Sequence, residues 1–372
     1  MQNLQFSWMT LGLATSLLFG VTACQPQAAT PPESNEVKTA QQPNQKAITA
    51  PKPATVSKPS VTAKTCLALS KSMQKIDDTS KIEDIYNIQQ TLKTCLPTAN
   101  NAEVLTLLDS YQAMYNRFLG IDIYMDDESF GAIAEALEQG KKVPVQPLEA
   151  TSPRIQYLVK LVESKADVSV LYLGEGNYTF HHSLQAMADI FTPFIQPDQK
   201  YFIDKLAKDN QDIFWNDGRI AVPFEELINR AVFWESYTNQ YQNSHFIQDA
   251  KALLIMYRRV LFSGLENTQW TDDDIRKFYD PADDQAIRQL AKRPNSVLAQ
   301  DAQTLLKFMA ISDDERQQLY PVPKSDEEGH EIQDWKKGRY QLEQASSIPS
   351  PWQENNGKDC FSSIICVDYN AE

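Results

Sequence analysis

From Cys66 onward, apolar residues recur at spacings of three and four, which is the period of an amphipathic helix. Long stretches of alternating apolar and polar residues, typical of half-buried strands, are absent. The sequence therefore predicts an all-α fold, either a multi-helix bundle or an irregular α-solenoid. The helical pattern is clearest in residues 82–92, 104–118, 155–162, 184–191, 201–206 and 227–234.

One stretch departs from the helical period. Residues 168–173 are rich in β-prone side chains, residues 174–177 contain two glycines and an asparagine, and residues 178–180 can return as a second strand. We expect at most one small β-hairpin, near residues 168–180. The alternative is an extended loop that leads into the next helix, which begins near His182 and Ser183.

Hydroxyl residues in front of acidic or proline residues predict several helix starts. Ser152 precedes Pro153, and a serine N-cap followed by proline at the first helical position is a common helix start. Thr271, Ser312 and Ser325 each precede a run of acidic residues, which favour the positive end of a helix. None of these runs has the alternating Asp-x-Asp-x-Asp-Gly pattern of a calcium loop, so no metal site is expected.

Residues 243–254 and 295–306 are related, with seven of twelve positions identical. In both copies Asn-Ser is expected to cap a helix, and Asp249 and Asp301 fall near its positive end. This pattern resembles the opening of tetratricopeptide-like repeats in envelope lipoproteins, which implies stacked helical pairs. The offset of 52 residues is longer than the roughly 34 residues of that family, and Gln242 stands where Pro294 precedes the second copy. The alternative is two similarly capped helices in an irregular bundle.

The N-terminus has the pattern of a secretory signal. No charged residue occurs between Phe6 and Ala23, and the apolar run is too short for a confident membrane span. The segment ends in Val-Thr-Ala-Cys24, which resembles the lipobox of bacterial lipoproteins, although positive charge is missing from residues 1–5. The resemblance implies cleavage after residue 23 and lipidation of Cys24. An ordinary cleaved signal or an uncleaved anchor is the alternative.

Gln25 follows the cysteine, where aspartate would indicate inner-membrane retention. An outer-membrane location is therefore expected, at the periplasmic face or exposed at the cell surface.

Composition divides the remainder of the chain into regions. Residues 24–64 contain many prolines and no aromatic residue, which predicts a disordered tether after the lipidated cysteine. Residues 65–345 form the expected helical domain, with a sub-boundary near 141–151, and residues 346–372 a C-terminal extension. The net charge of −14 disfavours nucleic acid and anionic lipid as partners, so contact with the membrane is expected only through the lipid anchor.

Four cysteines remain once Cys24 is set aside. In an oxidising envelope an even number favours disulfides, and sequence alone leaves three pairings open. Local separation favours Cys66–Cys95 and Cys360–Cys366.

The sequence offers few candidates for catalysis or ligand binding. Glu175 lies on a glycine-rich turn just before His181 and His182, a combination that could serve acid–base chemistry or bind a metal. A helix-capping loop with surface histidines is the alternative. Trp215 and Trp234 belong to an aromatic cluster that either stacks on sugars or forms core.

These observations predict no cofactor and name no reaction. We expect a lipid-anchored periplasmic protein that binds or scaffolds other envelope proteins. A peptidoglycan or glycan binder, a cell-wall enzyme and a structural envelope protein without a discrete ligand are the alternatives.

Overall fold

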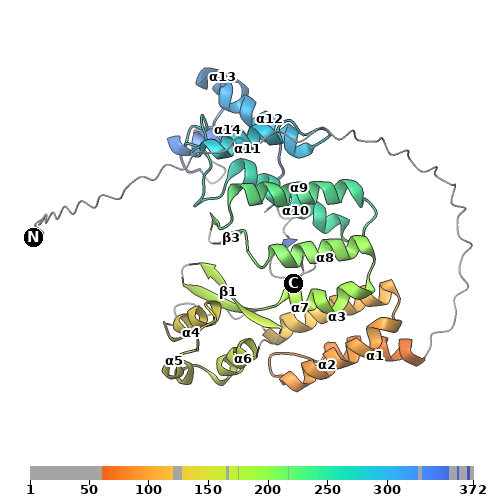
Figure 1. The fold of residues 1–372 in the computed structure, drawn as a ribbon. Coiled ribbons are helices and arrows are strands. Elements are labelled where there is room, and N and C mark those ends of the chain that lie inside the picture. The colour runs from red at the N-terminus through yellow and green to blue at the C-terminus, as the bar shows by residue number, and fades with distance from the viewer. Residues whose placement is uncertain are drawn as a thin grey trace, which may run out of the picture. The chain divides into compact units, whose positions relative to one another are not determined.

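The computed structural model describes residues 61–119, 128–164, 167–174, 176–216, 218–325, 329–351, 358–359 and 367–368. Within these ranges the fold is helical with three short two-stranded sheets (Figure 1), which confirms the predicted all-α class with a small hairpin. The signal segment, Cys24, the tether up to residue 60 and the Cys360–Cys366 pair lie outside the described residues.

The α-helices are α1 Val61–Met73, α2 Ile82–Cys95, α3 Asn101–Leu119, α4 Glu128–Glu138, α5 Val145–Ala150, α6 Pro153–Glu163, α7 Leu184–Phe191, α8 Pro197–Asp209, α9 Phe224–Gln240, α10 Ile247–Ser263, α11 Pro281–Leu290, α12 Val297–Ala310, α13 Asp313–Leu319 and α14 Asp334–Ser346.

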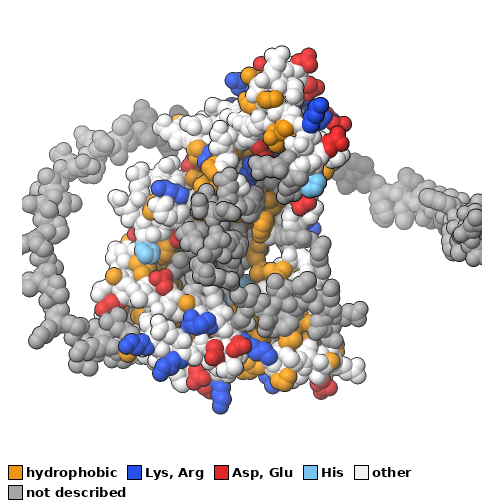
Figure 2. All heavy atoms as spheres, turned by 180° about the vertical axis from the view of Figure 1, so that it is seen from behind, with side chains coloured by type: hydrophobic (Ala, Val, Ile, Leu, Met, Phe, Trp, Pro, Cys, Tyr) orange, Lys and Arg blue, Asp and Glu red, His pale blue; other side chains and the backbone are white. Residues whose placement is uncertain are grey.

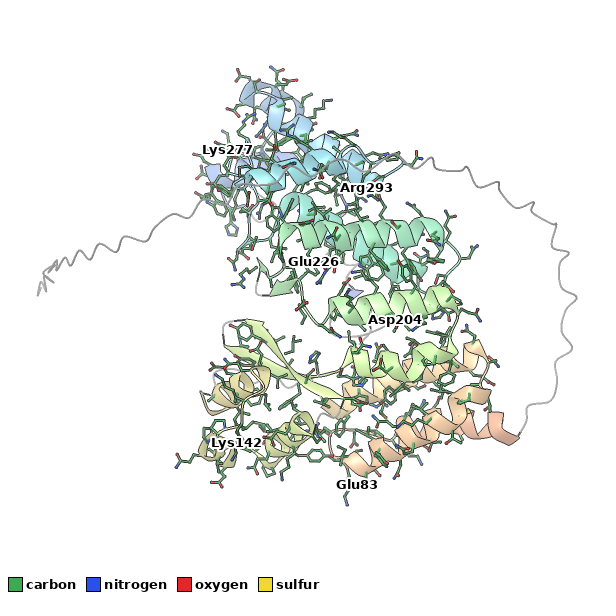
Figure 3. All side chains as sticks on the ribbon, viewed as in Figure 1. Glu83, Lys142, Asp204, Glu226, Lys277 and Arg293 are labelled. Atoms are coloured by element: carbon green, nitrogen blue, oxygen red, sulfur yellow. A yellow bond between two sulfur atoms is a disulfide. The ribbon has the colours of Figure 1, made fainter. Side chains whose placement is uncertain are left out.

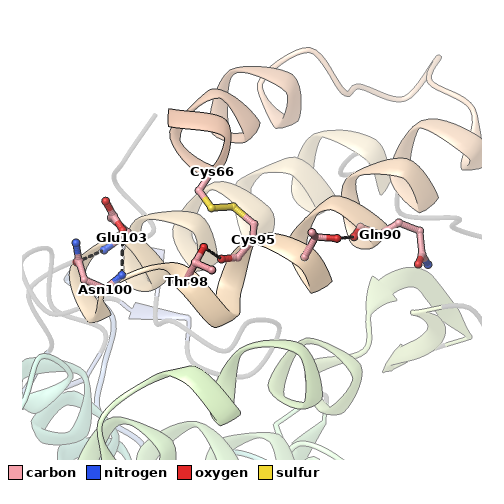
Figure 4. The surroundings of a disulfide bond; sticks show 7 residues. Cys66, Gln90, Cys95, Thr98, Asn100 and Glu103 are labelled. Atoms are coloured by element: carbon pink, nitrogen blue, oxygen red, sulfur yellow. Dashed lines mark hydrogen bonds between the residues drawn. A yellow bond between two sulfur atoms is a disulfide. The ribbon is translucent and has the colours of Figure 1, made fainter. Parts of the chain in front are cut away.

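Helix α1 packs against both α2 and α3, and a disulfide joins Cys66 of α1 to Cys95 at the end of α2 (Figure 4). Their Cα atoms are 5.5 Å apart, and both cysteines are buried. Arg117 of α3 donates hydrogen bonds to the carbonyls of Met73 and Ile76, which fixes the end of α1. The pairing agrees with the one predicted from local separation, and it ties the N-terminal helices into the core.

The predicted hairpin is present as β1 (Val168–Gly174) and β2 (Asn177–His182), which pair antiparallel. One face of the hairpin packs on the core, where the Phe180 ring contacts Phe130 of α4. Strand β2 extends two residues beyond the predicted end, so His181 and His182 lie on a strand and not at a helix start. Ser183 then caps α7, with its hydroxyl accepting from the N–H of Ala186.

The related segments occupy α10 and α12, which pack against each other. Their starts differ. Ser296 caps α12 as predicted, because its Oγ accepts from the N–H of Ala299. The predicted cap at Ser244 is wrong: α10 begins three residues later, and the Ser244 hydroxyl bonds the Tyr237 hydroxyl at 2.8 Å. The shared sequence therefore places two helices in contact without giving them equivalent ends.

The predicted helix starts are present at some positions and absent at others. Ser312 caps α13 as predicted, and Ser152 caps α6 with Pro153 at the first helical position. The helix predicted after Thr271 is absent, because residues 271–280 form turns and one isolated β-bridge. There the Asp272 carboxylate accepts from the backbone N–H groups of Arg276 and Lys277. A short acidic side chain that bonds the backbone ahead of it favours such a turn over a helix.

Candidate functional site

A cleft of about 500 Å³ lies along strand β1. Strand β1 contributes four consecutive residues to it, and the facing side comes from α7, the end of α8 and the loops around the second hairpin, β3 (Trp215–Asn216) and β4 (Arg219–Ile220). The cleft is therefore assembled from segments far apart in sequence. Its lining consists of Leu137, Glu138, Val162, Ser169, Val170, Leu171, Tyr172, His181, Ser183, Leu184, Gln185, Ala207, Asn210, Gln211, Ile213 and Ala221.

The register of the hairpin determines which backbone groups of β1 face the cleft. The N–H of Ser183 donates to the carbonyl of Asp167 at 2.8 Å, and each residue pair up to Tyr172 continues this register. Because antiparallel pairs alternate between bonded and non-bonded, Ser169 and Leu171 bond to β2, whereas Val170 directs its N–H and C=O away from it. No sheet of the described residues places a third strand beside β1. Strand β1 therefore presents a backbone edge to the cleft.

Ser169 and His181 are opposite each other on the two strands and share the cleft face of the hairpin. The Ser169 hydroxyl is 2.7 Å from His181 Nε2, while His181 Nδ1 is buried without a hydrogen-bond partner among the described residues. Burial lowers the pKa of His181 to about 4. The imidazole is thus neutral near pH 7, and its Nε2 can accept a proton only at a high desolvation cost.

His182 is directed to the opposite face of the hairpin, since successive residues of a strand alternate. Its ring stacks on Tyr115 of α3, with centroids 3.5 Å apart and an angle of 9° between the planes. Burial holds the pKa of His182 well below its usual range. The two histidines are therefore separated by the sheet and do not form one site, and Glu175, the third predicted member, lies outside the described residues.

A half-buried polar group fixes the start of β1. The carboxylate of Asp167 accepts from the hydroxyls of Tyr111 and Tyr115 at 3.2 and 3.3 Å and from the Gln89 side-chain amide. Burial raises the pKa of Asp167, and these hydrogen bonds oppose that effect. The network joins α2 and α3 to the residue where the hairpin begins, so it positions the edge strand that lines the cleft.

Neutral amides form the wall opposite β1. Gln185 lies on α7, and Asn210 and Gln211 follow the last turn of α8. The Gln211 amide donates to Gln185 Oε1 at 3.3 Å. Arg230 of α9 holds this end of α8 in place by donating to the carbonyls of Asp209 and Asp212.

The electrostatics of the cleft are mild. Among its described lining residues only Glu138 carries a charge, because His181 is neutral. Such a lining suits neutral hydrogen-bonding groups such as peptide amides more than phosphates or metal ions. Across the described residues, no group of three or more His, Cys, Asp or Glu side chains is arranged to hold a metal ion.

The structure separates the two tryptophans named from the sequence. Trp234 is completely buried, with Phe202 and Phe233 against its ring, so it belongs to the core and offers no stacking surface. Trp215 is half-buried. Sequence reasoning missed Trp335, which is 57% exposed on α14 and borders a cavity of about 900 Å³. Its only sequence signal is its position among polar residues.

Surface charge on the described residues is mixed. On the face shown in Figure 2, acidic and basic side chains are interspersed and do not gather into a patch of one sign. Figure 3 labels acidic and basic residues on different parts of the chain, among them Asp204 on α8 and Glu226 on α9. Glu226 accepts from Arg230 of its own helix, and Asp204 pairs with Lys200.

Comparison with known proteins gives no relative: no family model, no curated protein and no solved structure matches this chain. No helix in the described part of the chain is long and apolar enough to span a bilayer.

Proposed function

We propose that the chain is a lipid-anchored envelope protein whose helical domain binds another envelope protein in the cleft along β1. The signal-like N-terminus and Cys24 support the anchor, and the Pro-rich segment that follows supports a tether. The disulfide between Cys66 and Cys95 supports an oxidising compartment. Together these features support an exported, membrane-tethered protein.

The observation that carries the binding role is the composition of the cleft. One side is the backbone edge of β1, and the other is formed by the amides of Gln185, Asn210 and Gln211. A volume of about 500 Å³ falls within the range of specific ligand sites. Neutral donors and acceptors on both sides match the groups that a polypeptide presents.

The geometry favours binding over catalysis at this site. Ser169 and His181 have the separation of a nucleophile and its base. A base with a pKa of about 4 is too weak to activate a serine efficiently near pH 7. The buried Nδ1 also has no carboxylate among the described residues to stabilise an imidazolium. The pair therefore orients a hydroxyl for hydrogen bonding.

A photo-cross-linking amino acid at position 171 tests the role in intact cells. Leu171 lines the cleft, whereas Leu319 is an exposed leucine on α13 and provides a matched control. We expect a partner that cross-links from position 171, does not cross-link from position 319, and is lost when Cys24→Ser removes the lipid. Recovery of only abundant envelope proteins, equally from both positions, would reject the proposal.

A second function, glycan binding, is favoured by the exposed Trp335 ring. It borders a cavity whose lining includes Gln269, Lys336 and Arg339, and aromatic rings beside polar groups suit sugar binding. Sedimentation with purified peptidoglycan tests this function, with Trp335→Ala as the variant and Tyr279→Ala, at another exposed aromatic residue, as the control. Equal sedimentation of both variants and the unmodified protein would exclude Trp335 as a glycan site.

A further inference from the structure

Strand β1 has the properties of an acceptor for an additional strand. Val170 lies in the cleft, directs its backbone N–H and C=O away from β2, and makes no backbone hydrogen bond to another strand of the described residues. Tyr172 and Tyr178 form the next non-bonded pair of the ladder, before the register shift that precedes Gly174. An edge of this kind is usually shielded by charge, proline or a covering element.

Two of the usual protections of an edge, charge and proline, are absent from the cleft-lining part of β1. Residues 169–172 are Ser, Val, Leu and Tyr, with neither lysine nor proline among them. The second hairpin contacts β1, yet the two hairpins belong to separate sheets. Among the described residues, Val170 therefore adjoins the cleft and not a hydrogen-bonded neighbouring strand.

We propose that the cleft takes an extended polypeptide segment of the partner protein, which adds to β1 as a third strand. This inference rests on the proposed protein-binding function and names the form of the bound segment. Backbone pairing would supply affinity, and the two faces of the added strand would supply specificity.

The two walls of the cleft define the sequence that such a segment carries. The cleft is bordered by two kinds of side chain, the apolar Leu137 and Val162 and the amides of Gln185 and Gln211. Since side chains alternate along a strand, the bound segment has apolar residues at every second position and small polar residues between them. Four lining residues of β1 correspond to a contact about 14 Å long at roughly 3.4 Å per residue.

Proline at position 170 separates the backbone contact from the fold. Val170→Pro removes an N–H that the hairpin does not use, and proline is tolerated on edge strands where the N–H faces outward. Leu171→Pro removes an N–H that bonds to β2, so it is expected to disrupt the hairpin. Val170→Ala controls for the lost side chain. Circular dichroism and thermal melting establish which variants remain folded.

The probe is a displayed library of random ten-residue peptides, selected on the full chain and resynthesised with single N-methyl groups. Strand addition predicts that N-methylation of every second peptide residue weakens binding about tenfold, because each such methyl group removes a hydrogen bond to β1 and adds a clash. N-methylation of the intervening residues should have little effect. Val170→Pro weakens binding by a similar factor and Val170→Ala by less than about threefold. A methylation profile without alternation, or unchanged binding to folded Val170→Pro, overturns the inference.

The outcomes separate this inference from the proposed function. A partner that cross-links from position 171 and still binds the folded Val170→Pro protein would retain the protein-binding role and reject strand addition. Absence of a position-171 partner would reject the role itself. If Val170→Pro does not fold, the alternation of the N-methyl profile on the unmodified chain decides the question without it.

Discussion

The carboxylate of Glu235, on α9, accepts a hydrogen bond from the hydroxyl of Ser296, which caps α12, with both carboxylate oxygens 2.9 Å from Ser296 Oγ. The same carboxylate accepts from the backbone N–H of Leu298 in the first turn of α12. All these groups are buried. A negative charge at the positive end of a helix is favourable, so a side chain from one helix completes the cap of another helix 61 residues away in sequence.

Removal of this carboxylate is expected to destabilise the domain strongly. Glu235→Ala leaves two buried donors without their acceptor, which costs about 2–4 kcal/mol of unfolding free energy. Ser296→Ala costs about 1–2 kcal/mol, the value of an N-cap. Urea unfolding measures both, and Glu225→Ala, at an exposed position of the same helix, should remain within about 0.5 kcal/mol. A Glu235→Ala protein as stable as the control would contradict the bridging cap.

Loss of the disulfide should weaken the N-terminal helices. The bond joins residues separated by 29 positions, and closing such a loop stabilises the native state by roughly 3–4 kcal/mol in the chain-entropy model. We expect the Cys66→Ser, Cys95→Ser double variant to unfold at lower urea concentration than the oxidised protein. Reductant should shift the unmodified protein in the same direction and shift the variant, which keeps Cys360 and Cys366, by less. Equal midpoints with and without reductant would show that the bond contributes nothing.

Two glycines test the packing of the helices they occupy. A Cβ on Gly338 of α14 would lie 2.6 Å from the carbonyl oxygen of Asp273, whereas a Cβ on Gly131 of α4 would meet nothing within 4 Å. Gly338→Ala is therefore expected to cost about 1–3 kcal/mol through overpacking, and Gly131→Ala to stabilise by about 0.5–1 kcal/mol through helix propensity. Thermal melting of the two variants checks the opposite signs. Two shifts of the same sign would contradict the close approach of α14 to the loop.

Stability should fall as the pH is lowered from about 6.5 to 5. His181 and His182 have folded-state pKa values below the usual 6.5, to about 4 for His181. In this window the unfolded chain binds protons that the native state excludes, so stability declines with falling pH by up to about 1.4 kcal/mol per unit for each histidine.

Replacement of one histidine isolates this effect. His182→Phe keeps a ring to stack on Tyr115 and removes one titrating group, so its stability should change about half as steeply with pH between 6.5 and 5. Urea unfolding at several pH values measures both slopes. Identical slopes in the variant and the unmodified protein would show that buried His182 does not cause the acid sensitivity.

Much of the secondary structure was predictable because it depends on neighbouring residues. The three-to-four spacing of apolar residues identified the helices, and the run after Asp167 identified the hairpin. Ser152, Ser296 and Ser312 were recognised as caps because a cap bonds N–H groups within three residues. The helix start predicted at Thr271 was wrong. The Asp272 carboxylate accepts from a backbone N–H four residues ahead, and the resulting turn competes with a helix.

The candidate site was only partly predictable. The sequence drew attention to His181 and His182 but treated them as one pair. Because the two histidines are adjacent on a strand, their side chains lie on opposite faces of the hairpin. His181 instead contacts Ser169, twelve residues away in sequence. Trp234 was a candidate for sugar binding, and its complete burial assigned it to the core. The local sequence pattern predicts neither the Ser169–His181 contact nor the burial of Trp234, because both depend on which elements pack together.

The sequence by itself determined the helical class and indicated the hairpin and the local disulfide, since each follows from periodicity, turn residues or short separation along the chain. Only the tertiary structure decided that Glu235 completes the cap of Ser296 and that Gln185, Asn210 and Gln211 face the edge of β1. These contacts join residues distant in sequence, and their geometry depends on how helices pack around a shared core. The edge of β1 became a candidate binding site only when the register and its surroundings were known.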